Sequence, residues 1–187
     1  VSTKPHASVQ VELDSKVMVD LDKQQYALSD LTLKTQAEGK ELPFTSADVE
    51  LLGNINADMV KQLVAINDLV LAAKVSKDEQ SIDAKLTTNV TTNLSNEQTQ
   101  LKSVDLYATV IDPNLPTGKA EVNLTADITA DMKQQTVSLS ALALNVYELI
   151  INADVSAKKI LSDNPTFAGK LNVKPFNLRQ LAKQLAI

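Results

Sequence analysis

The sequence predicts an all-β fold with one C-terminal helix, in which repeated β-hairpins form a long, curved antiparallel meander shaped as a groove or half-barrel. Three observations predict this fold. Long segments alternate between apolar and polar residues, which is typical of half-buried strands. A shorter apolar pattern recurs at a nearly constant interval. Polar segments with good turn composition separate these elements.

The longest alternating segment runs from Ala120 to Lys133. Polar residues in this segment separate its apolar positions, which are Ala120, Val122, Leu124, Ala126, Ile128, Ala130 and Met132. Similar alternation starts at Val9, Val49 and Ile82. We therefore expect each of these segments to form a long strand with one apolar side.

A second pattern follows each long segment: two apolar residues three positions apart, then a third two positions further on. It starts at Leu28, Ile66, Leu101 and Leu139, which gives a repeat period near 37 residues. The change of spacing from three to two breaks the alternation. This break predicts a β-bulge or bend inside each return strand, and an ordinary loop between two shorter strands is the alternative.

We expect one repeated β-hairpin domain over residues 1–187, with about eight to eleven strands. The repeats cover approximately residues 9–38, 46–77, 81–112 and 120–150, and a C-terminal strand and helix cover 165–187. Polar turns that each contain Gln lie within the hairpins. Because the chain begins at Val1 without a methionine, we expect it to be a fragment of a longer protein.

The helix is predicted at the C-terminus. Asn177 and Gln180 have the spacing of a capping box, and Phe176 and Leu181 have the spacing of a hydrophobic staple. The apolar stripe of this helix consists of Leu178, Leu181, Ala182 and Leu185. Helical spacing also occurs over residues 58–66, but the repeat favours a hairpin there.

Composition argues against most catalytic and cofactor sites. The chain has no cysteine and one histidine, His6, which excludes disulfides and thiolate sites and argues against triads and multi-histidine metal sites. The chain has only four glycines, which are too few and too scattered for a glycine-rich phosphate-binding loop. A net charge of −5 argues against nucleic-acid binding. We therefore expect no enzymatic activity, no cofactor and no metal.

The apolar side of the predicted sheet cannot remain in water. The sheet can close on itself, fold over as a sandwich or curl into a trough, and its interior can be dry core or hold acyl chains. If it holds lipid, the lining residues are Val49, Leu51, Ile55, Leu86, Val90, Leu94, Val122, Leu124 and Ile128. The alternative is that these side chains pack on one another or under the helix. A membrane-spanning sheet alternates similarly, and the long, regular strands keep it as a minor alternative, whereas the six scattered aromatic residues argue against its aromatic girdles.

The C-terminal stretch NPTFAGKLNVKPFNLRQLAKQL, residues 164–185, resembles a characteristic element of the AsmA-like family of Gram-negative envelope proteins. The segments YALSDLTL (26–33) and GKELP (39–43) are also similar to that family's strand pattern. The resemblance covers most of the chain, and the C-terminal element is its most specific part. Members of the family are similar to TamB-like and bridge-like lipid transfer proteins.

The resemblance implies a segment of an elongated β-groove with an apolar interior, in a periplasmic protein that an N-terminal helix anchors in the inner membrane. The implied function is non-enzymatic: phospholipid transport and outer-membrane assembly. The implied partners are phospholipid acyl chains and other envelope proteins, with membrane contact through other parts of the longer protein. The alternative is a structural or interaction β module with a self-packed core and no lipid ligand.

Overall fold

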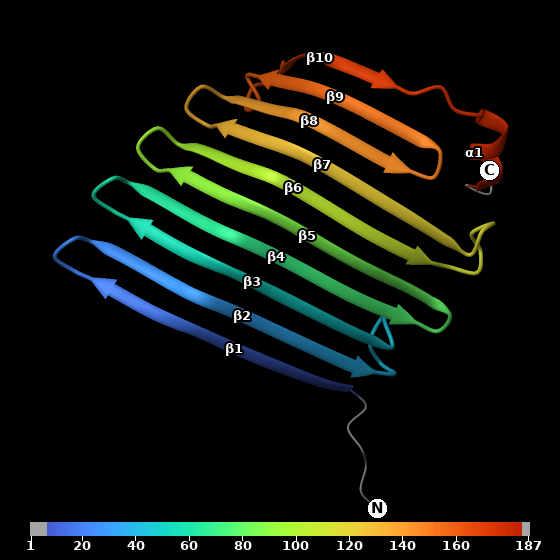
Figure 1. Cartoon of the computed structure of the whole chain (residues 1–187), viewed down its shortest axis with the longest axis horizontal. Coiled ribbons are helices and arrows are strands. Elements are labelled where there is room, and N and C mark those ends of the chain that lie inside the picture. Colours follow the sequence, from blue (N-terminus) through green and yellow to red (C-terminus); the bar gives the residue numbers. More distant parts are fainter. Residues whose placement is uncertain (1–6, 185–187) are drawn as a thin grey trace, which may run out of the picture.

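The computed structural model describes residues 7–184, which form one ten-stranded antiparallel sheet and a short helix. The strands lie side by side in sequence order (Figure 1). They are β1 (Ala7–Asp20), β2 (Gln25–Gly39), β3 (Ser46–Asp58), β4 (Leu63–Lys77), β5 (Gln80–Asn93), β6 (Gln98–Ile111), β7 (Lys119–Asp131), β8 (Thr136–Val146), β9 (Leu149–Lys158) and β10 (Thr166–Val173). The predicted all-β antiparallel meander is confirmed.

The sheet is open, and the described strands do not curl into the expected groove or half-barrel (Figure 1). Strands pair only with their neighbours in the chain, so β1 and β10 lie at opposite edges with one partner each. Closure would require these two edges to meet. The alternation of apolar residues fixes which side of a strand is apolar, but it does not fix how strongly the sheet bends.

The hairpins β1–β2, β3–β4, β5–β6 and β7–β8 occupy the four sequence repeats. Residues 58–66 form the end of β3, a turn and the start of β4, so the hairpin is confirmed there and the alternative helix is not formed. The sequence repeats did not predict β9. Its first apolar residues, Leu149 to Ile151, are consecutive, so its alternation is short.

Each of the strands β2, β4, β6 and β8 contains one bulge. The bulge residues adopt positive φ angles between 52° and 55°, and they are Asp30, Asp68, Ser103 and Ala141. Pairing with both neighbouring strands shifts register at these places. The β-bulges predicted from the break in alternation are therefore confirmed.

A side chain from the following strand caps each bulge. The backbone N–H of the bulge residue donates to an Asn or Asp Oδ1 atom: Asp30 to Asn54 (3.0 Å), Asp68 to Asn89 (2.9 Å), Ser103 to Asp127 (2.8 Å) and Ala141 to Asp154 (2.9 Å). The bulge turns this N–H out of the strand ladder, and a hydrogen bond to another acceptor contributes about 0.5–1.5 kcal/mol net. The four repeated contacts therefore stabilise a bulge that interrupts the normal strand ladder.

The turns at one end of the sheet also repeat. Consecutive turns are joined by backbone hydrogen bonds: Met59 N–H to Gln24 O (3.0 Å), Leu94 N–H to Gln62 O (2.8 Å), Met132 N–H to Glu97 O (3.1 Å) and Ile160 N–H to Gln135 O (3.2 Å). Within turns, the carboxylate of the last strand residue accepts a backbone N–H, as Asp58 does from Lys61 (3.0 Å). Backbone hydrogen bonding between neighbouring hairpins thus continues from the strands into the turns.

Acidification is expected to destabilise the turn at Asp58. Hydrogen bonds from Lys61 and Gln25 lower the pKa of the Asp58 carboxyl from 3.8 to about 2. A lowered folded-state pKa contributes stability that is present above about pH 4 and is lost as the pH falls towards 2. Urea unfolding of Asp58→Asn should therefore show a smaller loss of stability from pH 4 to pH 2 than the parent. An unchanged pH dependence would contradict this role.

Two glycines in the sheet are expected to respond oppositely to alanine. A Cβ at Gly53 would make only ordinary contacts of 3.6 Å, so Gly53→Ala should stabilise the strand by about 0.5–1 kcal/mol. A Cβ at Gly169 would clash with the carbonyl oxygen of Asp154 and lie 2.9 Å from the Cα of Val155. Gly169→Ala should therefore lower stability and weaken β10 pairing. Thermal unfolding of both variants tests this, and equal effects would contradict it.

The helix α1 (Leu178–Gln184) begins directly after Asn177, and the Leu181 N–H donates to the Asn177 carbonyl (2.9 Å). The predicted helix is therefore confirmed, whereas the side chain of Gln180 and all of Leu185 lie outside the described residues. Leu178 is 72% exposed, and α1 lies beside the end of the sheet (Figure 1). The helix does not cover the sheet.

Candidate functional site: an uncovered apolar face

One side of the sheet is apolar across all ten strands, and we call it the apolar face. Its central row follows the strand register through Leu13, Leu33, Leu51, Leu71, Leu86, Leu106, Leu124, Leu144, Ile151 and Val173. Directly opposed residues of antiparallel strands project to the same side. This leucine row is therefore continuous from one sheet edge to the other.

Two further rows flank the leucine row. The first runs through Val17, Leu28, Ile55, Ile66, Val90, Leu101, Ile128, Leu139, Val155 and Gly169. The second runs through Val11, Thr35, Val49, Ala73, Ala84, Ala108, Val122, Val146 and Leu149. No residue in these three rows carries a charge.

Small residues lie opposite the bulges, between the leucine row and the row of Ile55. They include Gly53, Thr88, Ala126 and Ala153, all of which are buried. The bulged strands place larger residues such as Leu31 and Leu69 opposite them. The alternation of small and large side chains keeps this part of the apolar face continuous across the bulges.

No second layer packs on the apolar face within the described part of the chain. Its side chains are shielded only by their neighbours in the sheet, and none of the described side chains is less than 2% exposed. Leu71, in the middle of the leucine row, is 38% exposed, and Leu13 at the edge is 70% exposed. An apolar surface of this extent is typical of a binding surface.

The predicted lining residues that fall within strands all lie on the apolar face: Val49, Leu51, Ile55, Leu86, Val90, Val122, Leu124 and Ile128. Leu94 lies in the turn after β5 and is 45% exposed. The sequence analysis missed the members on the return strands, such as Leu33 and Leu71. The bulges change the alternation there, so only the register shows that these residues belong to the same rows.

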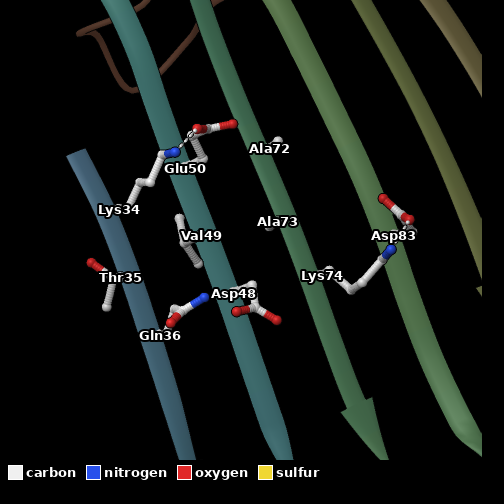
Figure 2. Close-up of a pocket in the computed structure, with 10 residues that line it drawn as sticks. All are labelled: Lys34, Thr35, Gln36, Asp48, Val49, Glu50, Ala72, Ala73, Lys74 and Asp83. Carbon is white, nitrogen blue, oxygen red and sulfur yellow. Dashed lines mark ion pairs between the residues drawn. The ribbon is translucent and has the colours of Figure 1, made fainter. Parts of the chain in front are cut away.

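The opposite side of the sheet is polar and carries cross-strand ion pairs. Lys34 pairs with Glu50 (3.2 Å), and Lys74 pairs with Asp83 (3.0 Å). Between these pairs lies a shallow depression of about 320 Å³ at the small side chain of Ala72 (Figure 2).

The aspartates on the polar side of β7 have structural roles. The Ser103 N–H is the main cause of the lowered pKa of the Asp127 carboxyl, and Asp131 accepts the Gln134 N–H (2.7 Å).

Among residues 7–184, no cluster of three or more His, Asp or Glu side chains is placed to hold a metal ion. No helix in this part of the chain has the length and apolar character needed to cross a membrane.

Comparisons with protein-family models, curated proteins and solved structures find no match for this chain.

Proposed function

We propose that the apolar face binds phospholipid acyl chains, as a non-enzymatic segment of an AsmA-like lipid-transport protein. The observation that carries the proposal is the uncovered apolar face, which crosses all ten strands and has no charge in its three central rows. Water contact with such a surface is unfavourable, and acyl chains would remove it.

Acyl-chain binding on this face would need no specific polar contact. Each buried CH₂ group contributes roughly 0.8 kcal/mol, whatever its position along the chain. The leucine row crosses ten strands that lie about 4.8 Å apart, so it spans about 43 Å, which is long enough to hold an extended acyl chain. Head groups would remain in water at the rim of the sheet while acyl chains lie along the leucine row.

The cellular setting follows from the resemblance to the AsmA-like family. We propose that the chain acts in the periplasm, within a longer protein anchored in the inner membrane, and contributes to phospholipid transport and outer-membrane assembly. The residues of the most specific matching element form β10 and α1. Other envelope proteins would then be its protein partners.

The competing function is a structural β module with a self-packed core. Such a core requires a second layer against the apolar face, and residues 7–184 form a single layer. A second copy or another protein could supply this layer. This alternative predicts a folded protein that takes up no lipid.

Lipid uptake from vesicles tests the proposal. The protein is incubated with vesicles that contain a fluorescent phospholipid and is then separated from them by size. We expect lipid in the protein fraction, and we expect an excess of unlabelled phospholipid to displace it. Glycerophosphocholine, which has the head group but no acyl chain, should not displace it. A lipid-free protein fraction would contradict the proposal.

A further inference from the structure

The two edge strands of the sheet expose unpaired backbone and apolar side chains. Almost every residue of β1 is exposed, and every residue of β10 is exposed. Neither strand contains a bulge or a residue with positive φ. Free edges are commonly protected by bulges or by short strands, whereas β1 is 14 residues long.

The two edge strands also differ from the other strands in the repeated bulge and its cap. β1 lacks the residue that caps a bulge in a neighbouring strand, and β10 lacks a bulge. In β3, β5, β7 and β9 the residue that caps the preceding bulge is Asn or Asp, three positions after the leucine row. In β1 this position is Lys16, which cannot accept an N–H. The strand that fits beside β1 is therefore one without a bulge to cap. β10 is such a strand, since it pairs with β9 without a register shift.

We propose that β10 of a second copy of this chain pairs with β1 and extends the sheet from one molecule to the next. Successive strands of the meander are antiparallel, so β10 runs antiparallel to β1. A second copy placed beside β1 by translation then meets it with antiparallel strands. The apolar faces of both copies lie on the same side.

The leucine row fixes the register of this contact. Continuing the row from one copy to the next places Val173 opposite Leu13. Leu171 then lies opposite Ser15, and Phe167 lies opposite Val19. All eight residues of β10 pair with Leu13–Asp20 without a bulge in either strand.

The contact would shield the most exposed side chains of the apolar face. Phe167 is 72% exposed, Leu171 is 67% exposed and Val17 is 69% exposed, because each lacks a neighbouring strand on one side. Pairing supplies that strand and satisfies the backbone N–H and C=O groups of both edges.

One feature of this register opposes the contact, because Lys16 lies opposite Lys170. Each lysine also has an acidic neighbour within its own molecule. The Lys16 Nζ lies 2.7 Å from Asp30, and Lys170 is directly opposite Asp154 in the register. The row across the contact therefore reads Asp, Lys, Lys, Asp and is neutral overall.

Cysteine cross-linking tests this contact, because the chain has no native cysteine. The proposed register places Met18 opposite Ala168, and both residues are exposed. Opposed Cβ atoms in antiparallel strands are close enough for a disulfide. Mild oxidation of the Met18→Cys, Ala168→Cys variant should give dimers and higher oligomers on non-reducing gels.

The matched control is Asp14→Cys with Ala168→Cys, which moves one cysteine four residues out of register. We expect at least tenfold less cross-linking for the control than for the Met18 pair. A mixture of the single variants Met18→Cys and Ala168→Cys should give cross-linked dimers, whereas neither single variant alone should do so. Circular dichroism verifies that each variant is folded.

Three results would overturn the proposal. One is that the folded Met18 pair remains monomeric and reduced under oxidation at high protein concentration. Another is that the control cross-links as strongly as the Met18 pair, which would indicate random collision. The third is a disulfide within a single molecule, which would mean that the chain's own two edges meet. Because the contact uses the sheet edges, these results are independent of lipid uptake.

Discussion

Replacing Val90 and Ile128 together by aspartate is expected to abolish phospholipid uptake while leaving the sheet folded. Both residues lie in the same row of the apolar face, on β5 and β7. A carboxylate placed against an acyl chain loses its hydration without gaining a partner. In the absence of lipid, the single-layered sheet leaves both carboxylates in contact with water. We expect at least a tenfold loss of fluorescent phospholipid in the vesicle assay.

The matched control is Thr91→Asp with Thr129→Asp, which adds the same charges to the polar side of the same two strands. This control should take up lipid as the parent does. Equal uptake by the Val90, Ile128 variant and the parent would contradict lipid binding on the apolar face. Unfolding of that variant, with the control intact, would instead mean that Val90 and Ile128 belong to a packed core.

Replacing Asp127 by alanine is expected to destabilise the sheet by about 0.5–1.5 kcal/mol, because the Ser103 N–H at the bulge of β6 loses its protein acceptor and is left to water. Asp127→Asn should retain most of the stability, since Asn54 and Asn89 cap the equivalent bulges with an amide oxygen. Urea unfolding of the three proteins measures the difference.

The asparagine variant separates the cap from the charge of Asp127, which also lies 3.4 Å from Lys102. If Asn and Ala at position 127 destabilise equally, the ion pair rather than the bulge cap is the important contact. If neither variant changes the unfolding midpoint, the cap contributes nothing measurable. Either result would contradict the stabilising role assigned to the four repeated caps.

The strands and bulges could be predicted because each leaves a local signal. Alternation identifies the strand that contains Val122 and Leu124, and the altered spacing after Leu28 identifies the bulge at Asp30. The caps leave a weaker signal. Asn54 and Asp127 each follow a leucine of the central row by three positions, but their role is visible only once the register between strands is known.

The bend of the sheet, and whether a second layer packs on its apolar face, could not be predicted in the same way. Both depend on geometry between strands and on partners, which alternation within one strand does not report. Leu33 and Leu71 illustrate the difference, since they join the row of Leu51 only through pairing across bulged strands. The position of α1 also depends on contacts beyond its own apolar stripe, and α1 lies beside the sheet (Figure 1).

The most direct test of acyl-chain binding is mass spectrometry of lipids extracted from the protein after expression in a Gram-negative host and purification without detergent. We expect phospholipid in stoichiometric amounts with the parent and with the Thr91, Thr129 control, and none with the folded Val90, Ile128 variant. A parent protein that is folded, as judged by its β-sheet circular dichroism, and free of phospholipid would contradict the proposed function.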